Sequence, residues 1–167
     1  MTEEDAMRNS QIHFMCQLGY PGPHVDNGWY GALMFQPRMI GVVVALGAVT
    51  ANPWLFLALS SVLWWSTIVP RRNVFDAIYN HLVLRARGLA PVPPAPAPRR
   101  FAQAMAATAA GLTAAALLEH ALVTAWFVEA LFAIGVVAAV FRDFCGAAVI
   151  YTRATRALRR DLSPLPC

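Results

Sequence analysis

Four apolar runs dominate the sequence, and each is close to the length of a bilayer crossing. They cover residues 39–51, 53–69, 101–118 and 124–140. A membrane helix needs about 20 mostly apolar residues. Inside hydrocarbon the chain has to satisfy every backbone N–H and C=O internally, and runs of this length do so as helices. We therefore predict an all-α integral membrane protein with four transmembrane helices.

Composition supports a membrane protein and argues against one that binds nucleic acid. Hydrophobic residues make up 58% of the chain, charged residues 13%, and the mean hydropathy is +0.50, which is high for a soluble domain. All 13 lysine or arginine positions are arginines, and most of them flank the apolar runs. Nucleic-acid binding needs a basic stripe on a solvated face. We expect these arginines to lie at lipid headgroups instead, and we predict no nucleic-acid partner.

The placement of arginine predicts the topology. Arginines such as Arg38, Arg99 and Arg142 lie beside one set of helix ends, whereas the turns at 51–53 and 119–121 contain none. Arginine and lysine are enriched on the cytoplasmic side of membrane proteins. Both termini and the connector between the two helix pairs are therefore expected in the cytoplasm.

The two halves of the membrane region repeat the same order of features. In each half an arginine precedes an apolar helix, a tight turn, a tryptophan (Trp54 or Trp126) and a second apolar helix that ends at Arg71 or Arg142. Both halves enter from the same side, so we predict a parallel repeat of two helical hairpins. Inverted repeats are common in secondary transporters, which makes a transporter less favoured.

Other segments precede or join the hairpins. Residues 1–37 are rich in turn formers and are predicted to be an irregular cytoplasmic segment that docks through its apolar side chains, with a free tail as the alternative. Residues 74–85 are predicted to form an interfacial amphipathic helix, with Asn73 as its N-cap and Asp76 at its third position. Residues 90–98 are typical of an extended, proline-rich linker.

The transmembrane domain is predicted to cover residues 38–151, and residues 152–167 to form a basic tail. Clustered arginines beside a membrane helix suit anionic lipid headgroups. The arginines of this tail are Arg153, Arg156, Arg159 and Arg160.

The third apolar run carries small residues at helical spacing. In lipid, helices associate through close backbone approach at such residues. The face either packs against the chain's own helices or docks another subunit. Its residues are Ala102, Ala106, Ala110, Gly111 and Ala114.

Glu129 is the acidic residue placed well inside a predicted crossing. A charged side chain near the centre of a membrane helix is costly, so it is normally turned inward and paired. Counting from the two turns places Thr113, Ser60 and Ser61 at a similar depth. We predict a buried polar clamp of these four residues, and the alternative is a proton or ligand site.

Two further residues are weaker candidates for chemistry. Cys145 follows the fourth helix and is a candidate thiol, but the sequence around it offers no histidine or lysine to activate it. His120 lies in the second turn, where it is a weak candidate ligand for a cofactor. We predict no metal, no cofactor and no catalytic residue, while a bound lipid or pigment stays open.

The residues at 64–80 (WWSTIVPRRNVFDAIYN) and at 95–103 (APAPRRFAQ), followed by Phe144-Cys145 and Tyr151, resemble DUF4395, a bacterial family of four-helix membrane proteins of unknown function. The resemblance covers roughly residues 26–151. It implies a bacterial membrane protein with this fold. Family members often carry a second cysteine or a small residue three positions after the one matched by Cys145. Here that position is Ala148, which argues against a two-thiol redox role.

The functional expectation follows from abundant packing surface and few reactive groups. We predict a non-catalytic accessory subunit of a larger energy-transducing complex, respiratory or photosynthetic, in the bacterial inner membrane. Its partners would be other transmembrane subunits and anionic lipids. The alternative is a small membrane protein of thiol or sulfur chemistry, or of transport, that uses Cys145.

Overall fold

The structure is a computed structural model that describes residues 3–20 and 28–159. In these residues the regular secondary structure is helical throughout, as the predicted all-α class requires. The α-helices are α1 (Glu3–Gln17), α2 (Trp29–Thr50), α3 (Pro53–Ile68), α4 (Val74–Tyr79), α5 (Ala97–Leu118), α6 (Leu122–Arg142) and α7 (Gly146–Arg159).

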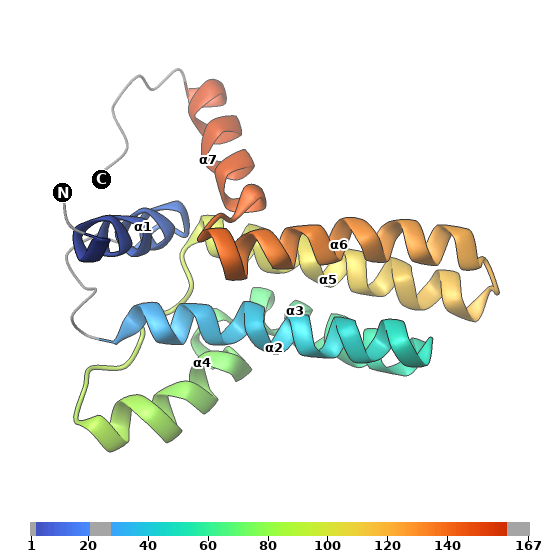
Figure 1. The fold of residues 1–167 in the computed structure, drawn as a ribbon, viewed down its shortest axis with the longest axis horizontal. Helices are drawn as coiled ribbons and strands as arrows, with labels where there is room; N and C mark the ends of the chain where they lie inside the picture. The colour runs from blue at the N-terminus through green and yellow to red at the C-terminus, as the bar shows by residue number, and fades with distance from the viewer. Residues whose placement is uncertain (1–2, 21–27, 160–167) are drawn as a thin grey trace.

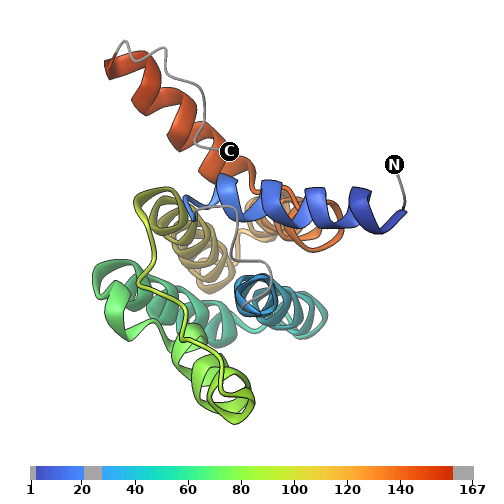
Figure 2. The same cartoon turned by 90° about the vertical axis from the view of Figure 1, so that its left-hand side faces the viewer.

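Four of these helices form a bundle. α2 and α3 make one hairpin and α5 and α6 the other, and the four lie side by side with both short turns at the same end (Figure 1). α3 packs most extensively on α5, and α2 packs on α6, which closes the bundle. The end-on view in Figure 2 shows the four helices side by side as a bundle. Its apolar centre includes Val44, Phe56, Leu63, Ala110 and Ala125.

Three bundle helices are long and apolar enough to cross a membrane. They are α2 with 22 residues, α5 with 22 and α6 with 21. α3 is also apolar, but it has 16 residues and is shorter than these. All three long helices begin before the predicted apolar runs, α6 by only two residues. α2 starts at Trp29 and continues through Pro37, because Leu33 and Met34 in its first turns are fully buried.

The amino-terminal segment differs from the irregular chain that we expected. Residues 3–17 form helix α1. The prediction of irregular structure was based on the turn-forming residues from Gly19 onward, which lie after this helix. Its side chains Phe14 and Met15 are buried in a second apolar core at the base of the bundle, the end opposite the two turns (Figure 1). This base core also contains Leu33, Leu84 and Ala148. Residues 21–27, which hold several of the turn formers, lie outside the described residues.

The connector between the hairpins leaves the bundle axis at the base (Figure 1). As predicted, Asn73 caps α4, since its Oδ1 accepts a hydrogen bond from the Phe75 N–H at 3.0 Å. α4 continues as a π-helical turn (Asn80–Leu84) and a 3-10 turn (Arg85–Arg87), and Gly88 ends it with a φ of 66°. The chain is then extended up to Pro96, where α5 begins four residues earlier than the predicted run.

The carboxy-terminal segment is more helical than a tail. α7 begins at Gly146, directly after α6, and projects from the base across the bundle axis (Figures 1 and 2). It packs against the start of α5, where the rings of Phe101 and Tyr151 lie 5.4 Å apart.

Candidate functional site

The most prominent polar group of the described residues is a buried network around Arg99. This side chain is 3% exposed, and its two terminal nitrogens bind both carboxylate oxygens of Asp76 at 2.6 and 2.9 Å. They also donate to the Tyr20 hydroxyl and to Gln36 Oε1, each at 2.9 Å. Gln103 donates to the same Gln36 oxygen at 3.0 Å. The Arg99 network therefore joins α2, α4, α5 and the segment after α1.

The Arg99 network has the properties of a structural junction. A two-pronged arginine–carboxylate pair is strong and directional, and removing one partner of a buried pair typically costs about 3–5 kcal/mol because the other charge is left uncompensated. Burial raises the pKa of Tyr20, although the Arg99 charge and hydrogen bond act in the opposite direction. Tyr20 is therefore a neutral hydroxyl at physiological pH that helps to enclose the ion pair.

Sequence reasoning missed this network. It assigned Arg99 to the lipid headgroups together with the other arginines, and Asp76 to the first turn of the interfacial helix. The two residues are 23 positions apart, on elements whose relative placement has no local sequence signal. One signal in the sequence could have indicated it. Gln36 and Gln103 are polar residues that each stand among apolar residues near the start of a helix.

A second polar cluster fastens α1 to the junction of α6 and α7. Asp143 ends α6 with a φ of 49°. Its carboxylate accepts hydrogen bonds from the Ser10 hydroxyl at 2.7 Å and from the Tyr30 hydroxyl at 2.6 Å. Gln17 donates to the Asp143 carbonyl and accepts from the Cys145 N–H at 2.8 Å. α1 is thus held by polar contacts as well as by its apolar face.

Cys145 is a free, partly buried thiol at the start of α7. Burial raises the pKa of this thiol, and it outweighs hydrogen bonds from the Ala148 and Ala147 backbone, which lower it. Three positions later, Ala148 is fully buried in the base core. The local geometry is that of a packed, protonated thiol.

The predicted clamp around Glu129 is not formed among the described residues. The Ser60 hydroxyl donates to the Ala107 carbonyl at 2.8 Å, and Ser61 and Thr113 each bond a carbonyl of their own helix. Glu129 is 8% exposed, and its Oε1 has no hydrogen-bond partner. These three hydroxyls each donate to a backbone carbonyl of α3 or α5. None of them donates to the Glu129 carboxyl on α6.

The small-residue face of α5 packs inside the chain. Ala110 and Ala114 are fully buried in the bundle core, where α5 meets α3, and Ala106 packs at its edge. A Cβ at Gly111 would lie 3.1 Å from Ser60 Oγ, so glycine permits the close approach. Ala102 is half-buried. Of the two interpretations of this face, contact with the chain's own helices is the one that the structure shows.

The remaining candidates lie on the surface. His120 is exposed in the second turn with a φ of 57°. Arg153 is exposed and Arg156 is half-buried on α7, while the Arg159 side chain and Arg160 lie outside the described part. Within residues 3–20 and 28–159, no group of three His, Cys, Asp or Glu residues could hold a metal ion.

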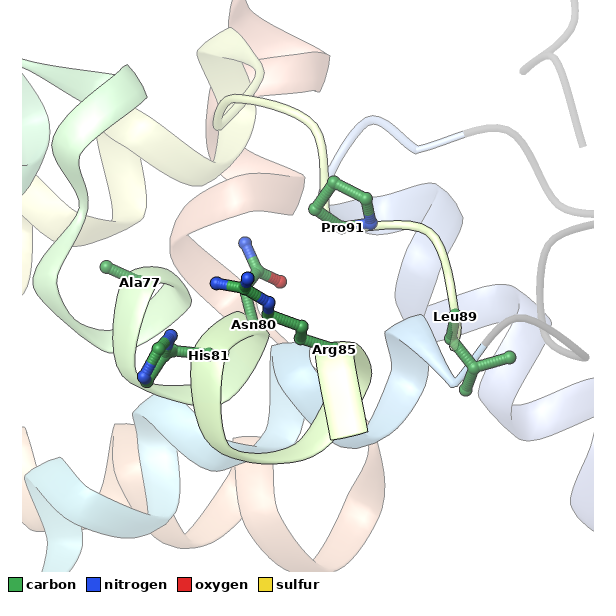
Figure 3. A pocket seen from close by; sticks show the side chains of 6 residues that line it. All are labelled: Ala77, Asn80, His81, Arg85, Leu89 and Pro91. Atoms are coloured by element: carbon green, nitrogen blue, oxygen red, sulfur yellow. The ribbon is translucent and has the colours of Figure 1, made fainter. Parts of the chain in front are cut away.

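Two hollows of similar size mark the surface. One, of about 390 Å³, lies between the α4 extension and the linker. Figure 3 shows Asn80, His81 and Arg85 on the helical wall, with Leu89 and Pro91 on the linker opposite. Asn80 Oδ1 already accepts a hydrogen bond from the Val92 N–H at 3.1 Å, so part of this polar wall serves to hold the linker. The other hollow lies between α2 and α6 and includes Glu129.

Comparison with known proteins identifies a family. No curated protein and no solved structure matches the chain. The sequence model of one family does match, over residues 32–156, close to the range of the resemblance inferred from the sequence motifs. This match includes all but the first three residues of the bundle, the Arg99 and Asp76 pair, and Cys145. The chain therefore belongs to the family described as domain of unknown function DUF4395.

Proposed function

We propose that this chain is a non-catalytic accessory subunit of a larger complex in the bacterial inner membrane, held there by four transmembrane helices with both termini in the cytoplasm. At 1.5 Å per residue α3 is about 24 Å long, somewhat short of a hydrocarbon core of about 30 Å. A short helix crosses when its flanks adapt or the bilayer thins locally. α3 runs beside α5 in the same bundle, which supports a shared crossing.

Exposed tryptophans support this placement. Trp54 and Trp126 lie near the two turns and are 65% and 62% exposed. Trp64 and Trp65 lie toward the base of the bundle on α3 and are also exposed. Tryptophan is enriched at both membrane surfaces, and this chain carries it near both ends of the bundle. The arginine-rich base would face the cytoplasm.

The observation that carries the accessory role is the open face of α6. α6 is the least buried of the three long helices. Phe127, Leu131, Ile134 and Phe141 are all more than half exposed along it. Gly135 lies among them, and a Cβ added there would meet nothing within 4 Å. A glycine on an open apolar helix lets a partner helix approach closely. By contrast, the polar groups of the base bind the chain's own elements.

The proposed partners are transmembrane subunits of a respiratory or photosynthetic assembly, because such assemblies join many helical subunits in the bacterial inner membrane. Anionic lipids are proposed as further partners of the α7 arginines. The alternative function, thiol or sulfur chemistry or transport through Cys145, is less well supported, since burial disfavours the thiolate that would react.

The test is extraction of the tagged full chain from its host membrane in mild detergent, followed by native gels and mass spectrometry. Gly135→Phe fills the open α6 face, and Ala58→Phe is the matched control on the exposed side of α3. We expect the wild type and Ala58→Phe to migrate with a large complex and Gly135→Phe to lose it at equal abundance. Migration of all three as free protomers would contradict the proposal.

A further inference from the structure

The hollow between α2 and α6 is a groove with one polar side chain. It has a volume of about 380 Å³, within the range of small-molecule sites in proteins. The α2 wall includes Gly41, Ala45 and Ala48, and the α6 wall includes Trp126, Glu129, Ala133 and Val137. Among the lining residues Glu129 is the ionisable one, and its Oε1 is buried without a hydrogen-bond partner in the described part of the chain.

The dimensions of the groove suit one hydrocarbon chain. The α2 wall runs from Gly41 to Ala48 and the α6 wall from Trp126 to Val137, which correspond to about 10 and 16 Å of helix. Dividing the volume by these lengths gives a cross-section of roughly 25–40 Å². A helix with its side chains is about 10 Å across, which is roughly 80 Å². A partner helix could therefore only lie over the groove, whereas a single hydrocarbon chain could lie within it.

The position of Glu129 orients the occupant. Glu129 is seven residues from the start of α6, about 10 Å along the helix from the turn end of the bundle. The exposed Trp126 lies one turn nearer that end, and the apolar wall continues from Glu129 past the middle of α6 to Val137, with Gly41 on the α2 side. A single-chain amphiphile in the groove would therefore place its head about 10 Å in from the turn end of the bundle, beside Glu129, and its chain along the apolar wall toward the base.

We propose that the α2/α6 groove binds a single-chain, lipid-soluble amphiphile whose head is either a hydroxyl that donates to the Glu129 carboxyl or a carbonyl that accepts from its protonated form. A polar group buried without a partner is costly, and a head group at this point would supply the missing hydrogen bond. The small side chains of Ala45 and Ala133 leave the space that the chain fills. This site is independent of the open α6 face and of the proposed accessory role.

The probe is a long-chain alcohol with a photoreactive diazirine in its chain, added to the purified full chain in lipid nanodiscs. Cross-linked peptides are mapped by mass spectrometry. We expect labelling to concentrate on residues 41–48 and 126–137. Ala45→Leu fills the groove and should reduce labelling at least tenfold, whereas Ala58→Leu, which changes another exposed alanine, on α3, should leave it unchanged.

Competition tests the head group. Hexadecanol carries a hydroxyl, a decyl-substituted benzoquinone carries carbonyls, and hexadecane has no head. We expect one or both of the first two to compete at least tenfold better than hexadecane, and the better competitor identifies the head. Glu129→Leu should abolish that advantage, while Glu119→Gln in the exposed turn should keep it. Labelling spread over all bundle helices, or equal competition by hexadecane and both headed compounds, would overturn the proposal.

Discussion

Arg99 Nη2 lies 2.6 Å from Asp76 Oδ1, and both side chains are almost completely buried at the base of the helix bundle. This pair joins the connector to the start of the second hairpin. The Tyr20, Gln36 and Gln103 side chains complete the hydrogen bonds around it. The ion pair therefore fixes the connector to the second hairpin, while the packing of α3 on α5 and of α2 on α6 holds the two hairpins together.

The Arg99 pair should be essential to stability. We expect Asp76→Ala to lower the free energy of unfolding by about 3–5 kcal/mol, because it leaves the Arg99 charge buried and unpaired. Arg100 is the matched control: it is exposed and donates to the Thr67 carbonyl, so Arg100→Ala should cost less than about 1 kcal/mol. Denaturant titration in detergent micelles measures both.

The double variant Asp76→Leu/Arg99→Met separates charge burial from packing. Replacing both charges with apolar side chains of similar size removes the uncompensated charge. We expect this protein to be more stable than Asp76→Ala. If instead it is as unstable as the single variant, the ion pair has a role that apolar packing cannot replace, and our account of the single variant is wrong.

Asp143 should hold α1 on the base. Asp143→Ala removes the acceptor of the Ser10 and Tyr30 hydroxyls, and we expect amide hydrogen exchange in residues 3–17 to rise at least tenfold. The rest of the bundle should keep its protection. Glu119→Ala in the exposed turn is the control. Unchanged exchange in α1 would show that its apolar face is sufficient.

Cys145 should react slowly and with a shifted pH dependence. Burial raises the pKa of its thiol in the folded protein above the unfolded value. The contribution of this thiol to the free energy of unfolding is therefore fully present below the unfolded pKa of about 8.5, and it is lost as the pH rises through the folded pKa. Alkylation of the folded protein should therefore need a higher pH than alkylation of the denatured protein.

Cys145→Ala should assemble normally, and its failure to do so at normal abundance would revive the thiol function.

Much of the helix architecture could be predicted from the sequence, because apolar runs and turns are local signals. The hairpin turns, the Asn73 cap and the family motifs belong to this class. The α1 helix was not predicted because its sequence lacks a clear helical repeat of apolar residues. Its apolar side chains are buried against residues distant in the sequence, such as Leu33 and Ala148. The Glu129 clamp failed because equal depth along different helices does not make side chains face one another. The Arg99 network required the tertiary arrangement of four segments.

The four-crossing topology underlies the proposed accessory role, and α3 is its critical element. Reporter fusions along the chain test it directly. We predict that alkaline phosphatase, which is active outside the cytoplasm, will work after Asn52 and His120. A cytoplasm-active fluorescent reporter should work after Leu89 and Thr155. Equal phosphatase activity after Asn52 and Leu89 would show that α3 does not cross, and phosphatase activity after Thr155 would contradict the proposed orientation.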